Sequence, residues 1–303
     1  MSARGSERRE IALGQTEIAF AMMLASTMLL PVGDTLSKLL TAVAHPAEIA
    51  FWRLAFQTLV LGTAAWLMPR RVTGRLFSPI LALGGVAAAA TLVLLIAAFS
   101  TMPIATAIAI FFVEPLILTV LSAFLLNEPV GWRRYLAVFV GLIGAVVVIR
   151  PNWSIFGAYT ILPLGAAVAF ALNMILIRIA SRTRSGLAIQ VGMSFYAALL
   201  LGAGLVAGAA LGLFAWTGTH GPAYLWPMYV AAGCLSGVTF LLIAGAYRRA
   251  PASVLAPMQY FEILGATLMG YIVFGDFPDA LTWLGTAIIL GSGLYVFHRE
   301  RRQ

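Results

Sequence analysis

Long apolar runs dominate this sequence and set the first limit on its fold. The runs 103–126 and 251–274 contain 24 residues each, and about 20 apolar residues are enough for an α-helix to cross the hydrocarbon core of a bilayer. Hydrophobic residues make up 61% of the chain and charged residues only 10%, compared with about 25% charged residues in soluble domains. The runs do not alternate as the strands of a barrel do. We therefore predict an all-α integral membrane protein.

Turn-forming breaks such as His45-Pro46 and Gly275-Asp276 separate the apolar runs. They divide the chain into ten predicted transmembrane helices with short connections. The predicted helices cover 15–41, 46–68, 77–99, 103–126, 132–150, 156–179, 186–212, 225–247, 251–274 and 280–298.

The basic residues predict how the chain is oriented. With the N-terminus in the cytoplasm, fifteen Lys and Arg residues fall on the cytoplasmic side and only Arg150 falls outside. Basic residues concentrate on the cytoplasmic side of membrane proteins, so we expect both termini to be cytoplasmic. The net charge of +8 is spread over many short loops. We therefore expect a lipid bilayer and no nucleic acid as a partner.

The sequence also contains an internal repeat. A shift of 148 residues aligns Gly85 with Gly233 and Glu114 with Glu262, and helices 1–2 match helices 6–7 at a shift of 140. Because each repeat has an odd number of helices, the two repeats would lie upside down relative to each other. Inverted repeats with a site at the middle of the membrane are common in secondary transporters. The predicted repeats are 11–150 and 155–298.

The two aligned glutamates each fall near the middle of an apolar run. A charged group at the bilayer centre costs about 2.5–3.5 kcal/mol or more, and usually faces water, protein or a partner. Glu114 and Glu262 could bind substrate or carry protons, or could form structural hydrogen bonds beside Pro115. Gln259 lies one turn before Glu262, and its repeat partner is Phe111. The two halves of a central cavity would therefore differ.

Local motifs resemble those of EamA-type transporters in the drug/metabolite transporter superfamily. They include the Leu125-Leu126-Asn127-Glu128 turn, the Gly141-Leu142-Ile143-Gly144 run, and the segments 256–262 and 274–279. The resemblance implies a cavity surrounded by helices 1–4 and 6–9. Helices 5 and 10 would pack outside it as scaffold and as a possible homodimer surface. It also implies a small-molecule substrate, no cofactor and a place in the bacterial inner membrane.

Three charged residues in the first two helices are further candidates. Asp34 and Lys38 are four residues apart, which favours a local ion pair, with an outer gate as the alternative. Arg53 lies inside the second helix and needs a partner, for which Asp34 and Glu114 are candidates. Its alternative role is to bind a substrate carboxylate. The repeat position of Arg53 is Met193.

Polar and aromatic residues complete the set of candidates. Thr91 and Thr239 are matched hydroxyls that could face the cavity or bond their own helix backbone. Asn173 is a further cavity candidate. The aromatic residues could form cavity walls or simply pack between helices, and they are Trp52, Phe111, Phe112 and Tyr260.

The resemblance implies a function of alternating-access transport, with export of amino acids or related compounds as the first expectation. Import of a vitamin or cofactor such as riboflavin or S-adenosylmethionine is the alternative, and a channel is another. The single Cys234 and three scattered His residues offer no metal-ligand spacing. We also find no convincing nucleophile–base pair, so an enzyme is not expected.

Overall fold

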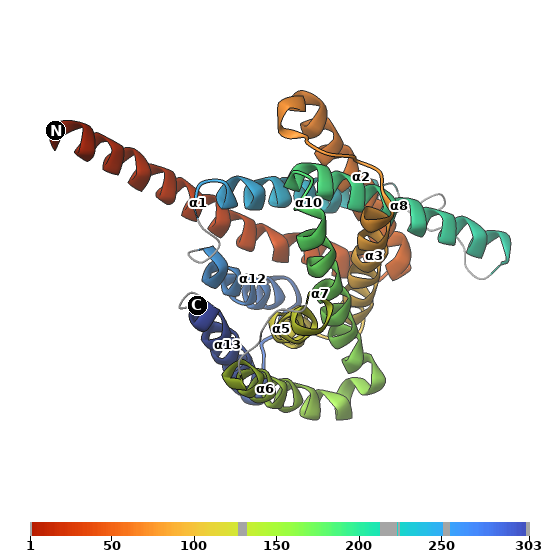
Figure 1. Cartoon of the computed structure of the whole chain (residues 1–303). Coiled ribbons are helices and arrows are strands. Elements are labelled where there is room, and N and C mark those ends of the chain that lie inside the picture. The colour runs from red at the N-terminus through yellow and green to blue at the C-terminus, as the bar shows by residue number, and fades with distance from the viewer. Residues whose placement is uncertain (1, 127–131, 213–222, 224, 251–254, 301–303) are drawn as a thin grey trace.

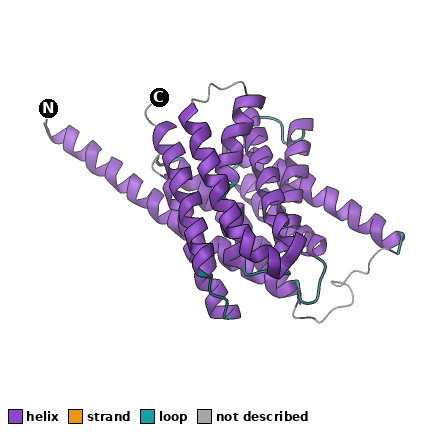
Figure 2. Cartoon of the chain, turned by 90° about the horizontal axis from the view of Figure 1, so that it is seen from below, coloured by secondary structure: helices purple, strands orange, loops and turns teal. Residues whose placement is uncertain are grey.

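The computed structural model describes residues 2–126, 132–212, 223, 225–250 and 255–300. Over these residues the chain consists of helices joined by short turns (Figures 1 and 2). The longer helices are α1 (Ser2–Leu40), α2 (Pro46–Leu67), α3 (Pro79–Phe99), α4 (Ile104–Phe111), α5 (Glu114–Leu125), α6 (Trp132–Phe156), α7 (Leu162–Ala180), α8 (Gly186–Ala210), α10 (Leu225–Tyr247), α12 (Phe261–Met269) and α13 (Ala280–Glu300).

Six segments of the described chain are long and apolar enough to cross a membrane. Three shorter apolar helices, within α6, around α12 and within α13, accompany them. The prediction of a multi-pass helical membrane protein is therefore confirmed. The count of ten spans and the cytoplasmic location of the termini stay predictions. The six segments are Glu17–Leu40, Pro79–Phe99, Ile104–Leu125, Trp153–Ala180, Gly186–Ala210 and Leu225–Tyr247.

Helix α1 begins earlier than the predicted span 15–41. It has 39 residues, while its membrane-crossing part is Glu17–Leu40. The N-terminal part of α1 extends away from the rest of the bundle (Figure 1).

The two predicted helices that carry the matched glutamates are interrupted. Run 103–126 divides into α4 and α5, and Pro115, which lacks an N–H, lies in the first turn of α5. In run 251–274 the described part starts with a 3₁₀ turn, η3 (Ala256–Tyr260), before α12. A π-helical turn, η4 (Gly270–Phe274), follows α12. Glu114 and Glu262 consequently both lie in the first turn of a helix.

The contacts between helices follow the predicted repeat. When each helix of a contacting pair is replaced by its equivalent in the other repeat, the result is again a contacting pair. Helix α1 packs on α10 and α3 packs on α7, while α2 contacts α10 and α3 contacts α8. Likewise α1 contacts α12 and α5 contacts α7. The pairs α2–α8 and α6–α13 each map onto themselves. This pattern is what two repeats related by a twofold axis would produce.

Two repeat-matched glycines extend this symmetry to individual atoms. Gly85 of α3 lies against α8, and Gly233 of α10 lies against α2. At each glycine an added Cβ would lie within 3.3 Å of a carbonyl oxygen, a Cβ and an amide nitrogen at positions i, i+3 and i+4 of the neighbouring helix. These atoms belong to Met193, Tyr196 and Ala197 at Gly85, and to Arg53, Phe56 and Gln57 at Gly233. The two triplets are 140 residues apart, which is the predicted shift.

Helices α6 and α13 form a pair of their own at one side of the bundle (Figure 1). Gly144 of α6 and Gly285 of α13 allow the two backbones to approach closely, because a Cβ on either would meet the other's carbonyl oxygen. Small residues serve the same purpose at many membrane helix interfaces. Large apolar side chains such as Phe139 and Leu284 remain exposed on the outside of the pair. A homodimer through this surface stays a prediction.

The close contact at Gly233 predicts a specific loss of stability. Gly233→Val should destabilise the protein by about 1–3 kcal/mol, because the new side chain would overlap α2. Gly204→Val in α8 is the matched control, since no atom lies within 4 Å of a Cβ at that position. Thermal unfolding of the two purified variants in the same detergent measures the difference. Equal melting temperatures would show that the α2–α10 contact is not as close as described.

Candidate functional site

A cavity of about 430 Å³ lies within the bundle, a volume that suits small-molecule ligands. Its lining comes from α1, α2, α3, α4, α5, α7, α8, α10, η3 and α12, and the described residues of α6 and α13 contribute nothing to it. This division agrees with what the family resemblance implied for helices 5 and 10.

Ten of the residues proposed from the sequence line this cavity. They are Asp34, Arg53, Thr91, Phe111, Phe112, Glu114, Asn173, Gln259, Tyr260 and Glu262. Trp52 is not among the lining residues, and instead packs against Trp226, Phe51 and other rings. Thr239 is fully buried outside the lining.

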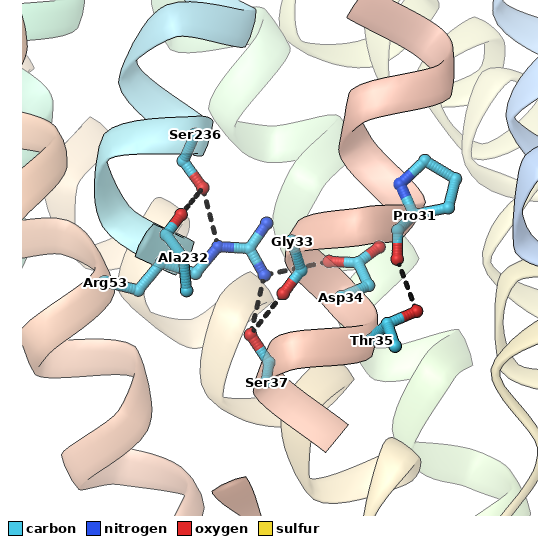
Figure 3. A network of polar contacts seen from close by, with 8 residues as sticks. All are labelled: Pro31, Gly33, Asp34, Thr35, Ser37, Arg53, Ala232 and Ser236. Atoms are coloured by element: carbon cyan, nitrogen blue, oxygen red, sulfur yellow. Dashed lines mark hydrogen bonds and ion pairs between the residues drawn. The ribbon is translucent and has the colours of Figure 1, made fainter. Parts of the chain in front are cut away.

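A buried ion pair forms the most connected polar feature of the lining (Figure 3). Arg53 Nη1 donates to Asp34 Oδ1 at 2.8 Å and to Ser37 Oγ at 3.0 Å, and Arg53 Nε donates to Ser236 Oγ at 2.7 Å. Ser236 in turn donates to the carbonyl of Ala232. The network therefore joins α1, α2 and α10, and confirms Asp34 as the partner of Arg53. Within the described chain, Arg53 Nη2 has no hydrogen-bond partner.

The predicted ion pair between Asp34 and Lys38 is wrong. Lys38 Nζ lies 3.1 Å from Asp276 Oδ2, donates to the carbonyl of Met102 at 3.1 Å and sits 4.4 Å from the centre of the Phe274 ring. The long Lys38 side chain reaches past the end of α1 to these groups. Asp34 is buried and pairs with Arg53, whose guanidinium group offers a fixed array of donors.

The ionic network has no counterpart in the other repeat. At the predicted shifts, Asp34, Arg53, Ser37 and Ser236 correspond to Met174, Met193, Ile177 and Ala88. Met174, Met193 and Ala88 also line the cavity. The positions of the ion pair are thus charged, while the matched positions are apolar and include adaptable thioethers.

Glu114 lies in an aromatic part of the cavity. The residue is 9% exposed, and its Oε1 accepts no hydrogen bond from the part of the chain that the structure describes. The rings of Phe112 and Tyr260 are 5.7 Å apart, and those of Phe111 and Phe170 are 5.5 Å apart. All four rings line the cavity with Glu114.

Glu262 has a different environment from its repeat partner. It is partly exposed in the cavity and interacts electrostatically with both Asp34 and Arg53. The structure therefore brings Glu262 to the ion pair and leaves Glu114 away from it. The two glutamates share a cavity but differ in their surroundings.

The remaining polar candidates mostly bond to protein groups. Thr91 Oγ1 donates to the Ala87 carbonyl in its own helix at 2.8 Å, which is the backbone alternative. Asn173 Nδ2 donates to the Gly84 carbonyl at 2.8 Å. Gln259 Nε2 donates to the Tyr247 hydroxyl at 3.3 Å. These contacts position α3, α7, η3 and α10 around the cavity.

Sequence reasoning missed several polar residues of the site and its surroundings. Ser37 and Ser236 were not singled out, because serines in membrane helices usually bond their own backbone. Glu48, fully buried, accepts from the Tyr229 hydroxyl at 3.5 Å. Its position in the first turn of α2 suggested a helix end and gave no sign of burial.

The sequence is similar to a family of known transporters over most of its length. The model of the EamA-like transporter family matches residues 17–150 and 157–297. The chain is 28% identical over 293 residues to the S-adenosylmethionine uptake transporter of Rickettsia bellii, covering 96% of this chain and 97% of that protein. It is 30% identical over 202 residues to the riboflavin transporter of Vibrio cholerae, covering 67% and 65%.

An exporter and a solved structure are also similar to this chain. The pseudopaline exporter of Pseudomonas aeruginosa is 27% identical over 265 residues, covering 86% of this chain and 88% of that protein. A protein of known crystal structure superimposes with a TM-score of 0.59 at 19% identity, covering 95% and 98% of the two chains. This last similarity concerns the fold alone.

The fold and the cavity define a multi-pass helical transporter of small metabolites. The chain belongs to the EamA-like transporter family. Its relatives are transporters and not enzymes, which fits the expectation from the sequence.

The matched residues Met174 and Met193 suggest substitutions that separate the structural role of the ion pair from its role in transport. Arg53→Met alone should destabilise the protein by about 3–5 kcal/mol, because it leaves Asp34 as an unpaired buried charge. The double variant Asp34→Met, Arg53→Met copies the matched residues Met174 and Met193. We expect it to recover most of the lost stability, because apolar side chains can replace a buried ion pair.

Thermal unfolding in detergent measures stability, and exchange in proteoliposomes measures transport. The expected result is a double variant that is folded but inactive. Recovery of transport together with stability would show that the ion pair has no role in transport.

Proposed function

We propose that this protein is a secondary transporter of the bacterial inner membrane that moves a metabolite bearing an α-amino acid group through the central cavity by alternating access. Family membership supports transport of a small metabolite. The arrangement around Arg53 is the observation that supports the substrate class. Both amino acids and S-adenosylmethionine contain this group, so the class includes the export expected first and the alternative import.

The charged end of the cavity can accommodate such a group. Arg53 Nη2 is available to donate to a substrate carboxylate while Nη1 and Nε hold Asp34, Ser37 and Ser236. Hydrogen bonds between arginine and carboxylate are among the stronger ones in proteins. Glu262, which interacts with the same ion pair, can accept from the α-ammonium group. The two substrate charges are adjacent, as are the two receiving groups.

The relatives differ in their substrates and in the direction of transport. S-adenosylmethionine and pseudopaline appear in the names of relatives that this chain covers over most of their length, one an uptake transporter and one an exporter. Riboflavin lacks both an α-amino and a carboxylate group, so the proposed site gives it no matching partner. We propose that riboflavin is not transported.

The contacts of Lys38 support alternating access. Lys38 connects the end of α1 with Met102 and Asp276, which the predicted orientation puts on the outer side. The cavity lining continues in the other direction to Gln190 and Arg178. The Lys38 and Asp276 side chains are 15% and 34% exposed, and ion pairs of such exposure contribute about 0.2–1 kcal/mol. Such a contact can open in each transport cycle.

Counterflow in proteoliposomes tests the proposed substrate class. Vesicles preloaded with an unlabelled compound receive the same compound in labelled form, in turn for several amino acids, S-adenosylmethionine and riboflavin. We expect saturable exchange of compounds with an amino acid group and none of riboflavin. Exchange of riboflavin alone would contradict the proposal, and non-saturable flux would indicate a channel. The direction of accumulation in intact cells then distinguishes export from uptake.

The two cavity glutamates are candidates for proton coupling. Protons that move with or against the substrate would have to bind at titratable groups in the cavity, where Glu114 and Glu262 lie. We expect the residual exchange by the double variant Glu114→Gln, Glu262→Gln to lose the pH dependence of the wild type. A pH series of initial exchange rates measures this. A double variant that keeps the wild-type pH profile would show that the coupling lies elsewhere.

A further inference from the structure

The proposed amino acid site gives Glu114 no role in binding. Arg53 and Glu262 account for one carboxylate and one ammonium group of a substrate. Glu114 is 9% exposed, lines the same cavity and has no hydrogen-bond donor on Oε1 from the described residues. Leaving a buried carboxylate oxygen without a donor is costly. A group from the substrate can therefore supply the missing partner.

A positive centre of the substrate would hold Glu114 in its carboxylate form. Glu114 lies in the first turn of α5, and Glu262 lies in the first turn of α12. The N-terminal end of a helix stabilises negative charge. Asp34 is paired with Arg53 at 2.8 Å. The other cation of the lining, Arg178, is exposed near the C-terminal end of α7. Neither Glu114 nor Glu262 forms an ion pair among the described residues, but Glu262 interacts electrostatically with Arg53, whereas Glu114 has no such cation.

Aromatic rings line the same cavity as this carboxylate, and one of them, Tyr260, interacts electrostatically with Glu114. Phe112 precedes Glu114 by two residues, and its ring lies 5.7 Å from that of Tyr260. Phe111 and Phe170 form a second ring pair in the lining. The faces of aromatic rings attract cations, and quaternary ammonium groups are often bound by such rings. A carboxylate with aromatic neighbours is thus suited to a positive centre that is itself partly apolar.

We infer that the recess formed by Glu114, Phe111, Phe112, Phe170 and Tyr260 binds a second positive centre of the substrate. This inference rests on the proposed function, because it assumes that the amino acid group occupies the Arg53 end. The substrate would then be a net cation, with an onium or ammonium group separated from its amino acid group. The apolar side chains of Met174 and Met193 in the lining would contact the neutral part of the molecule.

Two matched ligand pairs test the charge preference directly. S-adenosylmethionine and S-adenosylhomocysteine differ by one methyl group and the sulfonium charge. Lysine and norleucine differ at the end of the side chain, where lysine carries an ammonium group. Titration calorimetry with the purified protein in detergent measures the dissociation constants. We expect the cationic member of at least one pair to bind about tenfold or more tightly than its neutral partner.

The two repeat-matched glutamates provide the variants. Glu114→Gln should reduce the cation-to-neutral affinity ratio to about one while the neutral ligand binds as before. Glu262→Gln makes the same chemical change at the amino acid end, and should weaken both members of a pair while keeping their ratio. Phe112→Leu should reduce the ratio partially, since it removes one ring and keeps the carboxylate.

The outcomes separate this inference from the proposed function. Equal affinities within both pairs, or a ratio that survives Glu114→Gln, would overturn the second cation site and leave the amino acid site intact. A ratio abolished by Glu114→Gln while Arg53 and Glu262 variants have no effect would support the cation site and overturn the amino acid site. Failure of both cationic ligands to bind would overturn the inference.

Discussion

A guanidinium group buried among membrane helices needs a partner for its charge, and this requirement organises the centre of the molecule. Arg53 on α2 obtains its partners from Asp34 and Ser37 on α1 and from Ser236 on α10. Removing one member of a buried pair is costly, whereas apolar replacement of the whole pair is not. The ion pair is therefore weak evidence for a role in stability alone. Its location in the cavity lining connects it with function.

The protein combines a nearly symmetric scaffold with an asymmetric cavity. Helix pairs and even single backbone contacts repeat, as at Gly85 and Gly233. The lining does not repeat, since methionines stand where the second repeat would have the ion pair. A symmetric scaffold can rock between two states of similar energy, as inverted repeats do in other transporters. An asymmetric lining can distinguish the two ends of a substrate.

Much of this architecture was predictable because only helices and closed barrels can span a membrane. The length of the apolar runs predicted the helices. The repeat singled out Gly85, Glu114, Gly233 and Glu262. Local spacing was misleading for Lys38, whose partner Asp276 is 238 residues away. A sequence-local i,i+4 rule cannot find such a partner.

The burial of Glu48 and the serine contacts of Arg53 were also missed. They depend on how α2 packs against α1 and α10, which local sequence patterns do not reveal. The interruptions before Glu114 and Glu262 were only partly expected, since a proline can bend a helix without breaking it.

An experimental structure with a bound ligand would test the central claim most directly. The protein would be determined with S-adenosylmethionine or lysine at saturating concentration. The account predicts the carboxylate of the ligand at Arg53 Nη2 and its second positive centre beside Glu114, between the aromatic rings. A ligand bound outside the cavity, or one whose carboxylate lies away from Arg53, would contradict it.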